Sequence, residues 1–373
     1  MRLANVLHLG IKELRSLARD PIMLVLIVYA FTFSIYTAAT AMKETLHRAP
    51  IAIVDEDSSP LAARIAGAFY PPDFLPPQMI KPQELDRRMD IGLDTFALDI
   101  PPDFQRDLLA GKKPTIMLSV DATRMTQAFT GNAVIQNIVT GEVNAFLKRY
   151  RDVPDTTVNL VTRARFNPTL DNERFLGVMH VIDNVTLLAI ILTGAALIRE
   201  REHGTIEHLL VMPVTPLEIM TSKVWAMGLV VLVACYFAIL IIVQGILKVP
   251  VEGSMALFLL GTALHLFATT SLGIVLGTVA RSMPQFGLLM LLTLLPLQML
   301  SGSTTPRESM PDFVQAIMMA APNTHFVIIA QAVLFRGADG SVIWPNLLAL
   351  AAIGTALFTF ALARFRKAIV TMA

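Results

Sequence analysis

The sequence is poor in charged residues and in cysteine. Asp, Glu, Lys and Arg make up 16% of its 373 residues, against roughly 25% in soluble proteins, while 54% are hydrophobic. This composition excludes an ordinary soluble domain and indicates a membrane protein. The net charge is +1 and the basic residues form no single patch, so no nucleic-acid partner is expected. The single cysteine, Cys235, excludes an intrachain disulfide, and its apolar surroundings predict a small buried residue.

The sequence also lacks a recognisable catalytic or metal-binding motif. It has no Gly-x-x-x-x-Gly-Lys-Ser/Thr phosphate loop; residues 111–113, Gly-Lys-Lys, come nearest but lack the first glycine. The pair His203 and His208 does not make a metal site, and the acidic residues 55–57 fit a solvated turn better than a cation site. We therefore expect no catalytic residues, metal or cofactor on this chain. A polytopic membrane enzyme would need clustered acid, base or metal groups, which are not found.

Residues 1–20 have the pattern of an amphipathic helix. Their apolar residues recur about every 3.5 positions, and basic residues lie between them: Leu3, Leu7, Ile11, Leu14 and Leu17 alternate with Arg2, Lys12, Arg15 and Arg19. Such a helix lies in the headgroup plane, on the side with anionic lipid. Because proline disfavours helix in the residue before it, Asp20-Pro21 ends this interfacial helix.

Long apolar runs predict six membrane-spanning helices. Each can cross about 30 Å of hydrocarbon at about 1.5 Å per residue. Residues 21–42 form the first, and residues 173–373 hold the others, near 176–198, 223–247, 255–280, 285–303 and 344–363. Lysine and arginine of the short loops gather on one side, which identifies it as cytoplasmic. Both termini are therefore expected in the cytoplasm and residues 43–172 outside.

The segment 310–335 is apolar but interrupted by Pro311, Pro322 and Asn323. We interpret it as short helices in the outer leaflet that protein shields from lipid. The alternative, a separate full span, would place the C-terminus outside and contradict the distribution of basic residues.

Residues 43–172 alternate between strand and helix patterns. Strands are predicted at 51–54, 95–100, 115–121 and 157–166, with helices at 60–69, 103–110 and 125–150. A segment of about 130 residues can bury its own core. The predicted fold is thus a polytopic α-helical membrane protein with six transmembrane helices, an N-terminal interfacial helix and an inserted extracytoplasmic α/β domain.

Residues 199–213 are a polar segment between the second and third predicted spans. The first four residues, Arg-Glu-Arg-Glu, are all charged, and ions in hydrocarbon would cost several kcal/mol or more. The segment therefore lies on a membrane surface, where a soluble protein can contact it.

These features together resemble the permease subunit of type-2 ABC exporters, in the multidrug and lipid-type efflux branch with a large external domain after the first span. The resemblance covers nearly the whole chain and is most specific at 199–213, although His208 stands where glutamine is expected. The matching residues are Lys12-Glu13, Arg19-Asp20-Pro21, Val54-Asp55-Glu56-Asp57, Asn167-Pro168, Arg199-Glu200-Arg201-Glu202, Gly204-Thr205, Glu207, Leu209-Leu210, Pro213, Lys223, Leu300-Ser301-Gly302, Pro306 and Met310-Pro311.

The resemblance implies a multi-pass subunit in a bacterial plasma (inner) membrane. It would work as a homodimer or as a heterodimer with a similar permease, above ABC ATPase subunits that bind ATP and Mg. A periplasmic adaptor is left open. Residues 199–213 would be the coupling helix that contacts the ATPase, through Arg199, Glu200, Arg201, Glu202, Gly204, Thr205, Glu207, Leu209, Leu210 and Pro213.

Polar residues inside the predicted spans are candidates for a substrate path, because ionisable groups at membrane depth are often functional. His180, Asp183 and Asn184 share one helix face, and His265 lies deeper in the fourth span. Interhelical hydrogen bonding, or an interfacial position near the outer end, would explain the same residues. The pair Gly273 and Gly277 would allow close helix contact, within the chain or in a dimer.

Two functions remain to be weighed. The first is export of an apolar or amphipathic substrate, drug or lipid-like, from the cytoplasm or inner leaflet. The second is a membrane-anchored receptor or sensor that binds a ligand with the external domain. A receptor would need a cytoplasmic signalling domain, and the tail after Arg364 is too short to be one.

Overall fold

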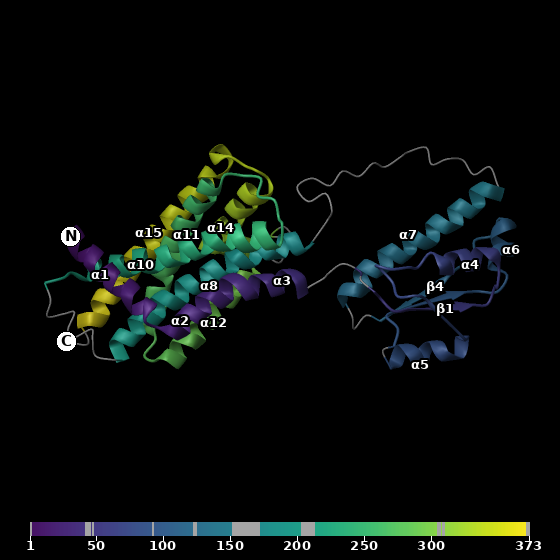
Figure 1. The fold of residues 1–373 in the computed structure, drawn as a ribbon, viewed down its shortest axis with the longest axis horizontal. Coiled ribbons are helices and arrows are strands. Elements are labelled where there is room, and N and C mark those ends of the chain that lie inside the picture. Colours follow the sequence, from purple (N-terminus) through teal and green to yellow (C-terminus); the bar gives the residue numbers. More distant parts are fainter. Residues whose placement is uncertain are drawn as a thin grey trace. The chain divides into compact units, whose positions relative to one another are not determined.

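The computed structural model describes residues 2–41, 46, 48–91, 93–121, 125–150, 172–202, 213–303, 307 and 310–370. The chain divides into two compact units: a helical unit, Met1–Ala41 with Ala164–Ala373, and a smaller unit, Met42–Arg163. Each unit is described separately (Figure 1).

The smaller unit is built on a four-stranded sheet in the order β2-β1-β3-β4. Strands β1, β2 and β3 are parallel, whereas β4 runs antiparallel to β3. In the register, Ile53 of β1 lies opposite Leu98 of β3. The elements are β1 (Ile51–Asp55), α4 (Pro60–Gly67), β2 (Gln78–Ile80), η2 (Pro82–Glu84), α5 (Leu85–Asp90), β3 (Phe96–Ile100), α6 (Phe104–Leu109), β4 (Met117–Val120) and α7 (Met125–Tyr150).

Both faces of β1 are covered, which explains its continuous apolar run. Ile51 and Ile53 share a core with residues of α4 and α7. Ala52 and Val54 face the other way and pack with Leu85 of α5. The short edge strand β2 was not predicted, because its three residues are largely exposed and carry no apolar alternation. The predicted strand at 157–166 lies outside the described residues.

The helical unit contains the long apolar helices. They are α1 (Leu3–Ala18), α2 (Pro21–Tyr29), η1 (Ala30–Ser34), α3 (Ile35–Ala41), α8 (Asn172–Glu202), α10 (Pro216–Phe237), η3 (Ala238–Ile246), α11 (Met255–Val279), α12 (Met283–Met299), α13 (Asp312–Met318), α14 (Pro322–Ala330), η5 (Gln331–Phe335) and α15 (Gly340–Val370). Helix α8 packs against α3, α10, α11 and α12 and is the most buried of the candidate spans found among the described residues.

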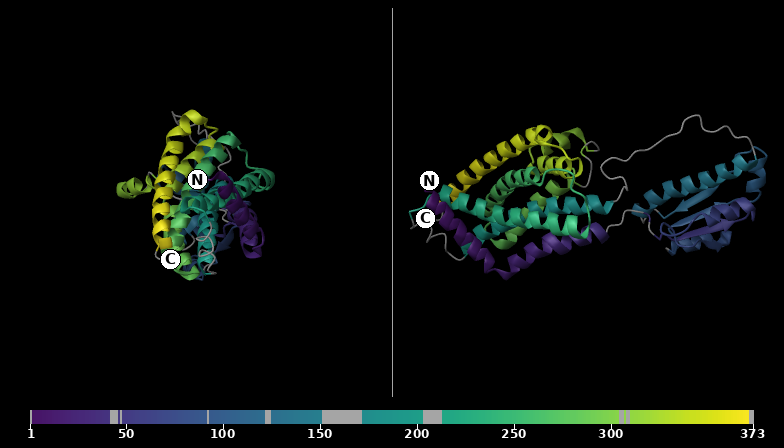
Figure 2. Two further views of the ribbon diagram at one scale, coloured as in Figure 1. Left: turned by 90° about the vertical axis from the view of Figure 1, so that its left-hand side faces the viewer. Right: turned by 45° about the horizontal axis from the view of Figure 1, so that its top comes forward.

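The prediction of a polytopic helical membrane protein is confirmed. In the described part of the chain, five helices are long and apolar enough to cross a membrane: Pro21–Thr40, Leu176–Glu202, Pro216–Ile246, Met255–Val279 and Gly340–Lys367. The predicted span at 285–303 corresponds to α12, a shorter apolar helix, Met283–Met299. Within 310–335 the structure has α13 followed by Pro322–Phe335, bent by 89°. Figures 1 and 2 place the marked N and C ends at the same end of the helical unit, here named the basal end.

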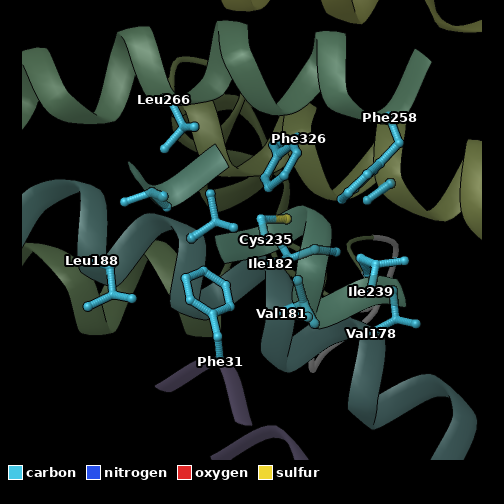
Figure 3. Close-up of a cluster of buried hydrophobic side chains, with 14 of the residues drawn as sticks. Phe31, Val178, Val181, Ile182, Leu188, Cys235, Ile239, Phe258, Leu266 and Phe326 are labelled. Atoms are coloured by element: carbon cyan, nitrogen blue, oxygen red, sulfur yellow. The ribbon is translucent and has the colours of Figure 1, made fainter. Parts of the chain in front are cut away.

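The core of the helical unit joins residues from several helices (Figure 3). Phe31 of the first span, Val181 and Ile182 of α8, and Phe326 of α14 belong to it. Cys235 is fully buried among them, so its predicted place as a small core residue is confirmed.

The glycines Gly273 and Gly277 lie in the contact between α8 and α11, within one chain. A Cβ atom on Gly273 would lie 2.8 Å from the carbonyl oxygen of Ile190, and one on Gly277 would lie 3.3 Å from that of Gly194. Of the two uses left open by the sequence, the structure therefore supports packing within the chain.

Candidate functional site

The basal end contains a group of four charges, Lys12, Glu13, Glu200 and Lys223, of which only Lys12 is exposed; the group is named here the basal charge cluster. The Lys223 ammonium lies 2.9 Å from Oε1 of Glu13 and 2.7 Å from Oε2 of Glu200. Lys12 lies 2.7 Å from Oε1 of Glu200 and 3.5 Å from Oε1 of Glu13. The cluster joins three elements, because Lys12 and Glu13 belong to α1, Glu200 to α8 and Lys223 to α10.

The cluster is balanced in charge and closed to water at its centre. The Lys223 side chain is 1% exposed and that of Glu13 is 7% exposed. Removing charges from water costs several kcal/mol per ion, which is offset only when every charge has close partners. Partial burial acts to lower the pKa of Lys12, but the carboxylates of Glu200 and Glu13 outweigh it and raise that pKa.

The last turn of α8 carries Arg199, Glu200, Arg201 and Glu202, and each residue contacts a different part of the bundle. Arg199 pairs with Asp20, which lies between α1 and α2. Glu200 belongs to the basal charge cluster. The guanidinium of Arg201 donates to the carbonyl oxygens of Gly277 and Ala280, at the C-terminal end of α11.

Glu202, the last residue of this turn, contacts α12. Its Oε1 accepts a hydrogen bond from the backbone N–H of Met283 at 3.2 Å. Met283 is the first residue of α12. One helical turn is therefore bonded to the α1–α2 junction, to α1 and α10, to the end of α11 and to the start of α12. A displacement of this turn would pull on all of them.

Asp20 fixes the junction between α1 and α2. Its carboxylate caps the N-terminus of α2 by accepting from the N–H of Met23 at 3.1 Å. Burial acts to raise the pKa of Asp20, but the bonds from Met23 and Arg199 outweigh it and hold that pKa below its usual value.

Helix α1 also docks on α10 through a glycine. A Cβ atom on Gly10 would lie 2.0 Å from the ring of Trp225, and the Trp225 indole donates to the carbonyl oxygen of Val6 at 3.2 Å. Glu218, in the first turn of α10, accepts from the backbone N–H groups of Arg2 and Thr215. Movement of α1 and α10 is thereby linked.

A cleft of about 310 Å³ lies beside the basal charge cluster. It is lined by Lys12, Glu13, Ser16, Leu17, Ala196, Arg199, Glu200 and Met227. The cleft belongs to the same site, because most of its polar wall consists of residues already described.

The structure places only part of the predicted coupling segment 199–213. Arg199, Glu200, Arg201 and Glu202 continue α8 and do not begin a new helix, since α8 runs to Glu202. Pro213 is exposed just before α10. The other predicted contact residues lie outside the described residues: Gly204, Thr205, Glu207, Leu209 and Leu210.

Sequence reasoning did not anticipate that Glu13 and Lys223 form one buried cluster. A signal was present for Glu13, which shares the buried face of α1 with Val6, Gly10 and Leu17 at helical spacing. A carboxylate on such a face needs a cation from another element.

Of the four predicted path residues, two are fully or nearly buried. His265 is stacked on Phe326, with ring centroids 4.2 Å apart, and its Nε2 lies 2.9 Å from the Thr186 hydroxyl. Asn184 donates to the carbonyl oxygen of Ala30 at 2.6 Å, at the first residue of the π-helical segment η1. Both residues hold helices together in this structure.

His180 and Asp183 have a different position. They lie in a partly exposed stripe of the α8 stretch 176–198, with Leu176, Leu187 and Ile191, while the rest of that stretch is buried. The structure therefore separates the predicted path residues into a packed pair and a partly exposed pair.

Replacing Arg201 with glutamine is expected to lower the stability of the helical unit by about 1–2 kcal/mol, because two helix-terminal carbonyls lose a charged donor. Thermal unfolding of the purified protein in detergent measures the change. Arg201→Lys should recover only part of the loss, since a lysine lacks the guanidinium fork. Arg281→Gln is the matched control, because Arg281 is exposed and directly follows Ala280 in the chain. An equal loss of stability in this control would refute the role given to Arg201.

Comparison with known proteins gives consistent similarities along the whole chain. The model of the ABC-2 family transporter protein matches residues 21–363. The chain is 62% identical over 371 residues to "Inner membrane transport permease YhhJ" of Escherichia coli (strain K12), covering 100% of this chain and 99% of that protein. It is 26% identical over 360 residues to "Probable multidrug ABC transporter permease YbhR" of the same strain, covering 95% and 96%. It is 25% identical over 373 residues to "Probable multidrug ABC transporter permease YbhS", covering 93% of each.

Proposed function

The chain belongs to the ABC-2 transporter family, and from this premise we propose that it is the membrane-spanning subunit of an ATP-driven exporter. It moves an apolar or amphipathic substrate, drug or lipid-like, out of the cytoplasm or the inner leaflet. ATP is hydrolysed by a separate ABC ATPase that docks on residues 199–223. Two permease subunits, identical or similar, form the pathway, and the smaller unit lies on the outer side.

The observation that carries this proposal is the bonding of the last turn of α8. Residues 199–202, four of the predicted ATPase-contact residues, contact α1, α10, α11 and α12, and the other predicted contact residues follow them in the chain. A force applied there by a soluble protein would reach four helices through charged bonds. An inert loop between two spans would need none of these contacts.

The orientation of the helical unit in this proposal follows from its basal end. The basal charge cluster, the docked basic helix α1 and both marked ends of the chain lie there. Basic residues near span ends favour the cytoplasmic side. Helix α1 adds an exposed apolar stripe, Leu3, Leu7 and Ile11, beside its buried face, which suits a position in the headgroup plane.

Two measurements test the proposal. The purified permease is expected to retain an ABC ATPase in mild detergent, and that ATPase should hydrolyse ATP in the complex.

The orientation of the chain in the membrane is tested by cysteine labelling. A membrane-impermeant maleimide should label Gly67→Cys in intact spheroplasts, because this residue of the smaller unit has open space around it. Pro213→Cys should react only after permeabilisation, with buried Cys235 as the silent background. Labelling of Pro213→Cys in intact spheroplasts would overturn the cytoplasmic position proposed for residues 199–223.

A further inference from the structure

Asp183 lies at membrane depth on α8. It is about 22 Å along the helix from Ile198 and about 10 Å from Leu176, at about 1.5 Å per residue. Within the described spans it is the one carboxylate that does not belong to a terminal turn of its helix. Its position in the partly exposed stripe of α8, with His180 and Leu187, is therefore unusual for a charged residue.

The carboxylate of Asp183 has an unused acceptor. Its Oδ1 is buried and makes no hydrogen bond among the described residues, and no Lys, Arg or His of that part of the chain lies within 4.0 Å. By contrast, every carboxylate of the basal charge cluster has a cation at 2.9 Å or less. A buried oxygen without a donor costs free energy, so a group that supplies a positive charge or a donor would be bound there.

Asp183 is partly exposed, and the face of α12 beside it is apolar. Gln298 of α12 donates to the backbone oxygen of Asp183 at 3.2 Å, which places α12 beside the stripe. Leu291, Leu295 and Met299 of α12 are exposed. Because a carboxylate facing lipid is costly, this face is better suited to a cargo pathway than to contact with acyl chains.

We propose that Asp183 is the recognition point for an amphipathic organic cation carried by the exporter. The cation's charge would lie beside the partly exposed Asp183 carboxylate, and its apolar body would lie along Leu187, Ile191 and the exposed face of α12. This inference rests on the proposed export function and names its substrate class.

The experiment uses two hydrophobic ions of the same shape and opposite charge, tetraphenylphosphonium and tetraphenylborate. Their binding is measured on the purified permease in nanodiscs, without any ATPase. The wild-type protein is expected to bind the cation at least about tenfold more tightly than the anion. Asp183→Asn should abolish this preference by weakening cation binding about tenfold, whereas Asp183→Glu should retain it. Asp312→Asn, a carboxylate in the first turn of α13, is the control and should change neither affinity.

Equal affinity of the wild-type protein for the two ions, or unchanged cation binding in Asp183→Asn, would overturn the proposal. If Asp183→Asn does not assemble, the wild-type protein gives a second readout. The cation, and not the anion, should protect Asp183 from modification by dicyclohexylcarbodiimide, as measured by mass spectrometry; equal modification with both ions would again overturn it. Since no ATPase is present, failure here is distinct from failure of the exporter proposal, which the ATPase copurification decides.

Discussion

Replacing Lys223 with methionine is expected to destabilise the helical unit by about 3–5 kcal/mol, because a buried ion pair loses one partner. Lys223 is 1% exposed and lies between Glu13 and Glu200, at 2.9 and 2.7 Å. Methionine matches the length of lysine, so the change removes charge with little change of volume. Two carboxylates would then share the one remaining cation, Lys12, whose side chain is 48% exposed. The loss is measured as a lower thermal midpoint and less monodisperse protein in detergent.

A second substitution separates the charge effect from packing. Combining Lys223→Met with Glu13→Gln leaves one cation and one carboxylate in the cluster, and should recover a large part of the lost stability. Lys248→Met, on an exposed lysine of the same unit, should have almost no effect. A double variant no more stable than Lys223→Met alone would show that the destabilisation does not come from unbalanced charge.

The sequence was sufficient for features that depend on periodicity. Apolar runs located the long helices, and the spacing of Leu3, Leu7 and Ile11 identified the amphipathic α1. These signals are local, because hydrophobic faces repeat at the helical period. The periodicity of α1 also contains a second, buried face, which includes Gly10 and Glu13.

The sequence was insufficient where partners are distant in the chain. Glu13 and Lys223 are separated by 210 positions, and no local pattern connects them. The helix also extends beyond the predicted span: the apolar run ends at Ile198, but α8 continues to Glu202. Arg and Glu are good helix formers, and here other elements supply ionic partners for Arg199 and Glu200 and backbone partners for Arg201 and Glu202. Hydropathy detects the end of the hydrocarbon-compatible run, whereas hydrogen bonding decides the end of the helix.

The same distinction explains the predicted path residues. His265, Asn184 and Asp183 look alike in sequence, as polar residues within apolar runs. In the structure His265 is packed against Phe326 and Asn184 bonds to Ala30, whereas Asp183 is only partly buried and its Oδ1 accepts no hydrogen bond from the described residues. Only the packing of neighbouring helices separates the two residues that join helices from the partly exposed Asp183.

Replacing Gly204 with tryptophan is expected to reduce the transport rate at least about tenfold, while the complex continues to hydrolyse ATP. Gly204 lies two residues beyond Glu202, outside the described residues, in the segment proposed to contact the ATPase. A glycine allows two backbones to approach closely, and a bulky ring would hold them apart. The turn at 199–202 would then receive less of the motion that its bonds to α1, α10, α11 and α12 distribute.

The measurement is ATP hydrolysis together with ATP-dependent uptake of rhodamine 6G or a fluorescent lipid into inverted vesicles. Gly141→Trp is the matched control, because a Cβ atom on Gly141 would meet nothing within 4 Å, and both activities should be unchanged. Normal transport by Gly204→Trp would contradict the coupling role of this segment. Loss of both activities together with loss of the copurified ATPase would instead show that Gly204 is needed for docking, which is compatible with contact at this segment but not with the expected uncoupling. In that case the ATPase would need Gly204 in order to bind, and the basal charge cluster would act only within the permease, after the ATPase has bound.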